Sequence, residues 1–89
     1  MAYRIEIIES AQRALGESDR RTRLRVSRAI DKLAANPRPP GSTKLVGTAG
    51  RYRIRVGNYR ILYEIQDAVL LVLVVKVGHR RDVYRPGGL

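Results

Sequence analysis

The chain has 89 residues, and its 18 lysines and arginines outnumber its eight acidic residues, giving a formal net charge of +10. This length fits a single domain spanning residues 1–89, with no room for a separate cofactor domain. Because the sequence has no cysteine and one histidine, it excludes a disulfide framework and a thiolate metal site, and it argues against a zinc centre. The positive charge attracts polyanions, so RNA, DNA, an acidic protein and an anionic membrane are the candidate partners.

Two apolar segments bear on the location of the protein. The N-terminal segment MAYRIEIIES has charges within its apolar residues, which is not the pattern of a signal peptide. The longest apolar run, AVLLVLVV at 68–75, is far shorter than the roughly 20 residues that cross a membrane. The sequence therefore predicts a soluble cytoplasmic domain with no membrane contact.

The first 40 residues predict one strand followed by two helices. Residues 3–8 (YRIEII) mix alternation with β-branched side chains, as a short strand does. Ser10 is a candidate cap for a short helix, and Ser18 or Asp19 for a longer one. Apolar residues of the longer helix recur at helical spacing: Val26, Ile30, Leu33 and Ala34. The pair Asn36-Pro37 is expected to end this helix.

The second half of the chain predicts three strands. YRIRV (52–56) and YRILYEI (59–65) alternate, and Gly57-Asn58 between them is a two-residue hairpin signal. VLLVLVVKV (69–77) is apolar on both faces, which suits a central strand. The predicted order is β-α-α-β-β-β. We expect an α+β domain in which a helical hairpin packs on one face of an antiparallel sheet.

The Gly57-Asn58 turn also predicts which side chains share a face. It places Arg55 directly opposite Arg60. One face of the hairpin is apolar and should meet the helices: Tyr52, Ile54, Val56, Tyr59, Ile61 and Tyr63. The other face carries Arg51, Arg53, Arg55 and Arg60, with Leu62 and Glu64.

Such a basic face needs an explanation beyond solvation. Like charges directly opposite each other destabilise a sheet, and neutral polar residues would solvate the face equally well. A polyanion that supplies the countercharge is therefore favoured over a merely solvated surface. Glu64 is expected to form a structural ion pair on this face.

The segment after the predicted central strand extends this chemistry with His79, Arg80, Arg81 and Tyr84. The strand should carry these residues to the edge of the same sheet. The arginine fork matches a phosphate, and a tyrosine ring can stack on an unpaired base. The pattern predicts an RNA-binding groove, and composition alone leaves binding and cleavage both open.

Further arginines lie near the start of the second helix: Arg20, Arg21, Arg23, Arg25 and Arg28. They fit either a solvated helix surface or a contact with RNA. His79 likewise fits either acid–base work, for which its ordinary pKa is suited, or a place in a turn.

Three segments together, KLVG (44–47), YRIRVGNYRILYEI (52–65) and VLVVKVGHRRDVY (72–84), resemble the RelE/ParE toxin superfamily, and in particular its RelE branch. The resemblance implies the β-α-α-β-β-β fold and a toxin of a type II toxin–antitoxin module. It further implies a ribosome-dependent endoribonuclease that cuts mRNA in the A site and is neutralised by a co-encoded antitoxin. The alternatives are a ParE-like inhibitor of DNA gyrase and a non-catalytic nucleic-acid-binding module.

The resemblance also implies site residues. The catalytic set is Arg53, Arg55, Arg60, Arg80 and Tyr84. The further RNA contacts are Lys44, Arg51, His79 and Arg81. The implied reaction is attack of a ribose 2′-OH on the adjacent phosphodiester, with no metal and no small-molecule cofactor. Family members often have lysine at the positions of Arg53 and Arg55. Because arginine stays protonated in proteins, the general base is left open.

Overall fold

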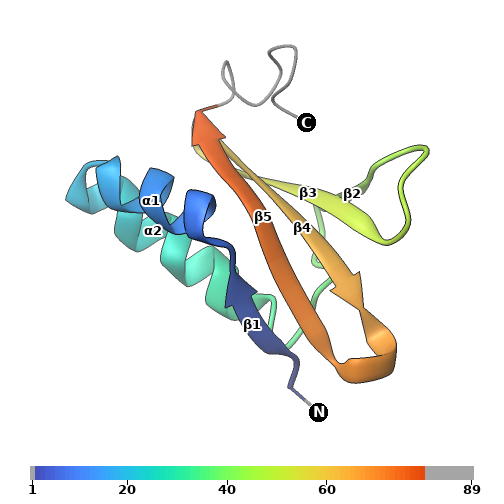
Figure 1. The fold of residues 1–89 in the computed structure, drawn as a ribbon. Coiled ribbons are helices and arrows are strands. Elements are labelled where there is room, and N and C mark those ends of the chain that lie inside the picture. Colours follow the sequence, from blue (N-terminus) through green and yellow to red (C-terminus); the bar gives the residue numbers. More distant parts are fainter. Residues whose placement is uncertain (1, 80–89) are drawn as a thin grey trace.

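The computed structural model describes residues 2–79, which form a five-stranded sheet with two helices on one face (Figure 1). The elements are β1 (Arg4–Ile7), α1 (Glu9–Glu17), α2 (Arg20–Lys32), β2 (Thr43–Lys44), β3 (Arg51–Val56), β4 (Tyr59–Gln66), the 3-10 turn η1 (Asp67–Val69) and β5 (Leu71–His79). The predicted α+β class is confirmed.

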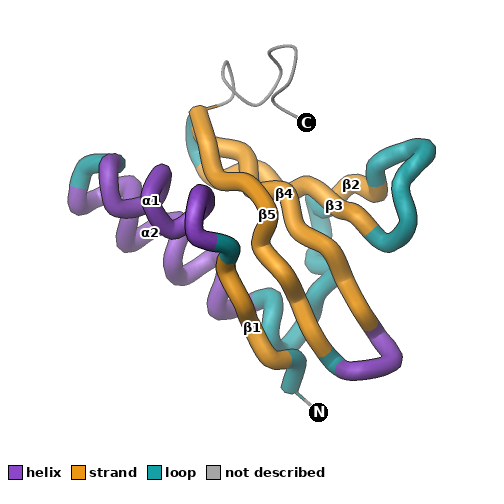
Figure 2. The backbone as a smooth tube through the Cα atoms, in the orientation of Figure 1, coloured by secondary structure: helices purple, strands orange, loops and turns teal. Residues whose placement is uncertain are grey.

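The sheet has the strand order β1-β5-β4-β3-β2. The β3–β4 and β4–β5 pairs are antiparallel, as predicted, and β2 pairs with β3 in the same way. The expectation of a wholly antiparallel sheet is wrong for β1, which runs parallel to β5. The helices connect β1 to the rest of the sheet, and this long connection returns the chain to the far edge. The short strand β2, which the sequence did not predict, adds a fifth strand, and the loop after it projects beyond the sheet (Figure 2).

The two helices begin differently. Asp19 caps α2, because its carboxylate accepts a hydrogen bond of 3.3 Å from the backbone N–H of Thr22. The prediction that Ser10 caps α1 is wrong, since α1 begins at Glu9 and its N-cap is Ile8. The Ile8 N–H still donates to the Val74 carbonyl at 3.0 Å, so the strand pairing continues to the first residue before the helix. None of the helices within residues 2–79 is long and apolar enough to cross a membrane.

The hairpin register is the predicted one. Val56 pairs with Tyr59 and Arg55 with Arg60, and the turn residue Gly57 has a φ of 58°. This positive φ is the backbone conformation that glycine adopts without steric cost. The register therefore separates an apolar face from a basic one, as the alternation predicted.

The core lies between the helices and the apolar face of the sheet. Its buried residues are Ala11, Val26, Ile30, Leu33, Ile54, Ile61, Tyr63, Ile65, Val72, Val74 and Val77. Tyr52, Val56 and Tyr59 pack against this cluster, which confirms that the tyrosines of the hairpin serve the core. The Tyr63 hydroxyl donates to the Pro37 carbonyl at 2.7 Å, and burial raises the pKa of Tyr63 to about 12.

A β-bulge changes the phase of β5 halfway along. Tyr63 pairs with Val74 and Leu62 with Lys76, so Val75 has no counterpart on β4. Strict alternation would place Lys76 on the helix side with Val74. The extra residue turns Lys76 to the opposite face and returns Val77 to the core.

Candidate nucleic-acid interface

We call the outer surface of the hairpin the arginine face: Arg51, Arg53, Arg55 and Arg60. These residues come from two neighbouring strands, and directly opposed residues in such a pair lie about 5 Å apart at Cβ. Arg51 and Arg55 are exposed, whereas Arg53 and Arg60 are half-buried. Partial burial restricts the side chains of Arg53 and Arg60, so these two guanidinium groups are held closer to fixed positions than exposed ones.

The charge on this face is strongly unbalanced. Within the described strands β3, β4 and β5, Glu64 is the only acidic residue. Its carboxylate lies 3.7 Å from Arg51 Nε and accepts a hydrogen bond of 3.0 Å from Gln66. The predicted ion pair of Glu64 is therefore present, and it falls at the end of the face away from Arg55 and Arg60.

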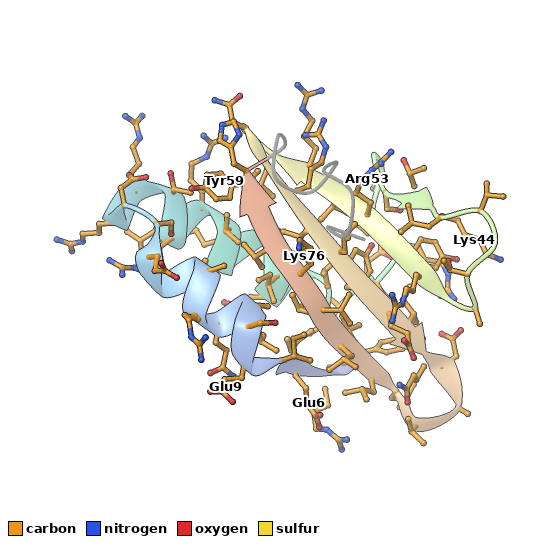
Figure 3. The ribbon with its side chains drawn as sticks, turned by 45° about the horizontal axis from the view of Figure 1, so that its top comes forward. Glu6, Glu9, Lys44, Arg53, Tyr59 and Lys76 are labelled. Carbon is orange, nitrogen blue, oxygen red and sulfur yellow. The ribbon has the colours of Figure 1, made fainter. Side chains whose placement is uncertain are left out.

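Lys76 joins the arginine face from β5, and the sequence did not predict this. The residue pairs with Leu62, which itself pairs with Arg53, so all three side chains belong to the same face. Figure 3 shows Lys76 over the middle of β5, with Arg53 on the β3 side. Only the bulge at Val75 brings Lys76 here, and an alternation pattern carries no signal for a bulge.

An apolar hollow adjoins the arginine face. Leu62 is 4% exposed and lies outside the main core, on the side of the arginines. It lines a hollow of about 310 Å³ with Leu45, Val46, Thr48 and Arg51. Val46 is completely exposed. The surface thus offers an apolar contact next to a guanidinium group.

Two predicted RNA contacts lie away from the arginine face. Lys44 is exposed, but it pairs with Tyr52 and so projects from the other side of the sheet, at the margin visible in Figure 3. His79 pairs with Tyr59 on the helix side, and their ring centroids are 5.8 Å apart in an edge-to-face arrangement. Its neighbour Gly78 is the residue opposite Arg60.

His79 lines a second hollow, of about 330 Å³. Its other lining residues come from α1 and the position after α1, from β4 and from β5: Ala14, Glu17, Ser18, Tyr59, Lys76, Val77 and Gly78. The structure therefore brings together Arg51, Arg53, Arg55 and Arg60, and places His79 at the end of β5 on the other face. Arg80, Arg81 and Tyr84 lie outside the described residues.

Positive charge continues from the hairpin tip onto α2. Arg25 packs against the turn, because a Cβ atom built at Gly57 would lie 3.2 Å from its guanidinium nitrogen. The other arginines of this helix that the sequence singled out are exposed as well: Arg20, Arg21, Arg23 and Arg28. No group of three or more histidine, cysteine or acidic side chains within residues 2–79 is arranged to hold a metal ion.

A different set of polar contacts, which we call the Arg38 cluster, consists of Tyr3, Arg38, Tyr52 and Asp67. Arg38 forms two hydrogen bonds to the Asp67 carboxylate, at 2.8 and 3.3 Å, and a third to the Tyr52 hydroxyl at 3.1 Å. The Tyr3 hydroxyl donates to Asp67 at 2.5 Å. The hydrogen bonds from Arg38 and Tyr3 hold the pKa of Asp67 below its usual value, whereas the bond to Asp67 raises the pKa of Tyr3.

This cluster joins the residue before β1, the proline-containing loop, β3 and the turn after β4. The Arg38 guanidinium also lies 5.4 Å from the centre of the Tyr52 ring, within cation–π range. Each charge in the cluster has a partner of opposite sign or a hydroxyl. The cluster therefore acts as a clamp, by which we mean a set of polar contacts that holds together segments far apart in the sequence.

Comparison with known proteins agrees with the resemblance seen in the sequence. Residues 4–84 match the family described as the ParE toxin of the type II toxin-antitoxin system parDE. Toxin RelG of Mycobacterium tuberculosis is 33% identical over 86 residues, covering 96% of this chain and 99% of that protein. A putative RelE-like toxin protein of Escherichia coli is 32% identical over 88 residues, covering 94% of this chain and 92% of that protein.

Solved structures share the fold. The archaeal RelE–RelB complex from Pyrococcus horikoshii OT3 superposes with a TM-score of 0.81 at 28% identity, over 90% of this chain and 97% of that one. The toxin–antitoxin complex RelBE2 from Mycobacterium tuberculosis gives 0.77 at 29% identity, over 90% of this chain and all of that one. From its sequence and its fold, the chain belongs to the RelE/ParE superfamily of toxins from type II toxin–antitoxin systems.

Proposed function

We propose that this toxin is an endoribonuclease that cleaves mRNA on the ribosome, in the A site. The observation that carries the proposal is the arginine face, where Arg55 and Arg60 lie directly opposite each other and Glu64 lies at the far end. A phosphodiester backbone is the polyanion that such a surface suits. Similarity to RelE-type toxins supports the same conclusion.

The proposed reaction needs fixed positive charge more than any other group. A ribose 2′-OH attacks the adjacent phosphorus, the bond to the 5′-oxygen breaks, and a 2′,3′-cyclic phosphate and a 5′-hydroxyl are formed. Negative charge builds on the phosphoryl oxygens and on the leaving oxygen. Cations held in place before the reaction stabilise this charge without reorganisation, so they lower the barrier.

The half-buried Arg60 is the group that we assign to the scissile phosphate, with assistance from Arg53 and Arg55. Two parallel N–H donors allow a guanidinium to bind two phosphate oxygens at once. Because arginines stay protonated, Arg53 and Arg55 act electrostatically and not as the general base. Arg80 is assigned to the leaving oxygen and Tyr84 to orienting the substrate.

The remaining contacts with mRNA are assigned to Arg51, on the arginine face, and to Lys44, His79 and Arg81. None of these assignments involves a metal ion or a small-molecule cofactor. Chelation with the ribosome kept intact should therefore leave the chemical step unchanged. Products that end in a 3′-hydroxyl would contradict this mechanism.

The proposed protein partner is a co-encoded antitoxin, since the similar RelE structures include complexes with RelB. We expect an acidic or apolar segment of the antitoxin to compete with RNA, either by covering Arg53, Arg55 and Arg60 or by displacing the segment that carries Tyr84. The test is single-turnover cleavage by the purified toxin–antitoxin complex. Full activity of the complex would contradict this proposal.

A second candidate function is inhibition of DNA gyrase, because the family that matches the chain bears the name of the ParE toxin. Mapping RNA ends and DNA breaks after expression in translating cells separates the two. Cuts within codons of translated messages support the ribonuclease. DNA breaks with intact messages would favour the gyrase inhibitor.

A further inference from the structure

Lys76 owes its position to an irregularity in the sheet. The bulge at Val75 interrupts the regular pairing between β4 and β5, and bulges commonly re-aim a side chain near a functional site. Without it, Lys76 would point toward the helices. The register instead places Lys76 in one row with Arg53 and Leu62, at the β5 edge of the arginine face, where it also borders the hollow next to α1.

The position of Lys76 relative to the arginines follows from the register. Arg53, Leu62 and Lys76 form one row across β3, β4 and β5. Neighbouring strands are about 4.8 Å apart, so Arg53 and Lys76 are separated by roughly 10 Å across the sheet. Leu62 between them is buried, which leaves the two cations on either side of an apolar floor.

The next row toward the hairpin tip holds Arg55, Arg60 and Gly78. Lys76 is therefore the diagonal neighbour of Arg60 on β5, a spacing within reach of long side chains. Gly78 carries no side chain beside Arg60. Arg60 and Lys76 are thus close enough for neighbouring phosphates of one RNA strand to reach both.

Among residues 2–79, none of the ion pairs includes Lys76. It is half-buried, and it lies beyond Val74, the last residue of β5 that pairs with β1. A lysine kept only for solubility would need neither a bulge nor partial burial.

We propose that Lys76 is an RNA-contacting residue that binds a backbone phosphate neighbouring the one held by Arg60. This inference rests on the proposed function and adds to it a direction for the RNA, which crosses the sheet from β3 toward β5. Lys76 supplies binding at a flanking phosphate, whereas Arg60 acts on the scissile one.

The experiment measures binding of a single-stranded RNA whose 2′-oxygens are all methylated, so that the nucleophile is blocked and cleavage cannot occur. Fluorescence anisotropy at a series of salt concentrations gives the slope of log affinity against log salt. Loss of one phosphate contact reduces this slope by about 0.7 for a single strand. We expect Lys76→Met to show this reduction for RNAs of different sequence, and Lys76→Arg to retain the original slope.

Lys32→Met is the matched control, because it makes the same change at an exposed residue in the last turn of α2. Its slope should equal that of the unsubstituted protein. Equal slopes for Lys76→Met and Lys32→Met, with RNA still bound, would overturn the assignment of Lys76 and leave the proposed function standing. Absence of RNA binding by the unsubstituted protein would overturn the assignment of Lys76 to a phosphate of free RNA, whereas the proposed function is tested separately by cleavage on programmed ribosomes.

Discussion

The arginine face and the Arg38 cluster use the same residue type in opposite ways. Arg38 has a carboxylate at 2.8 Å, a tyrosine hydroxyl at 3.1 Å and an aromatic ring beneath it. On the arginine face, Arg55 instead lies opposite Arg60. The cluster joins distant parts of the chain and favours folding, whereas the face concentrates like charge and opposes it. The contrast teaches that residue type alone does not assign a role to an arginine: its place in the fold and the side chains opposite it must be compared.

The largest expected effect is on the arginine face. Arg60→Ala should reduce cleavage about 100-fold, or roughly 3 kcal/mol in the barrier, in line with loss of one preorganised donor. Arg60→Lys should be intermediate, because it keeps the charge and loses the bidentate fork. Single-turnover cleavage on programmed ribosomes measures both. A rate for Arg60→Ala within twofold of the original would show that the face does not act on the scissile phosphate.

A substitution in the Arg38 cluster should lower stability and leave cleavage nearly unchanged, the reverse of what we expect on the arginine face. Arg38→Met keeps much of the side-chain volume but removes the hydrogen bonds to Asp67 and Tyr52, so we expect the melting temperature to fall by a few degrees. Cleavage by the folded variant should stay within twofold of the original. Thermal unfolding and cleavage at a temperature well below the melting point test the two parts separately. An unchanged melting temperature would refute the clamp.

The stabilisation from Asp67 should depend on pH. Its folded-state pKa is lowered by the hydrogen bonds from Arg38 and Tyr3, so its contribution is complete above the ordinary value of 3.8 and is lost as the pH falls through the lowered pKa. Asp67→Asn should therefore be less stable than the original protein at pH 6. The difference should shrink below pH 4. Chemical denaturation at a series of pH values measures it, and a difference that grows with acid would contradict the sign.

The smallest expected effect is a gain in stability on the arginine face. Arg55→Gln removes one member of a like-charge cross-strand pair, a contact that costs on the order of 0.2–1 kcal/mol. The melting temperature should stay the same or rise slightly in low salt, and any rise should shrink as salt screens the repulsion. Thermal unfolding of Arg55→Gln and of the original protein at a series of salt concentrations measures this difference in melting temperature. A loss of several degrees would show that Arg55 stabilises the fold.

The parts of the fold that depend on local pattern could be predicted from the sequence. The Gly57-Asn58 turn fixed the pairing of Arg55 with Arg60, and the alternation assigned the two faces of the hairpin correctly. These features depend on neighbouring residues and on a glycine with positive φ. The turn and the alternation were enough to predict which side chains of the candidate site share a face on β3 and β4.

The parts of the fold that depend on long-range packing could not be predicted from the sequence. Tyr3 and Asp67 are 64 residues apart, and nothing in either local sequence indicates their hydrogen bond. The parallel pairing of β1 with β5 and the bulge at Val75 likewise arise from how the sheet assembles. As a result, no signal in the sequence indicated that Lys76 shares a row with Arg53, or that the register puts Lys44 on the other face.

The central claim is that the arginine face acts on RNA while the Arg38 cluster maintains the fold. Single-turnover cleavage by Arg60→Ala and Arg38→Met, measured side by side at a temperature where both are folded, tests it most directly. The account predicts a loss of about 100-fold for Arg60→Ala and a change of less than twofold for Arg38→Met. Equal rates for the two variants, or a larger loss for Arg38→Met, would contradict it.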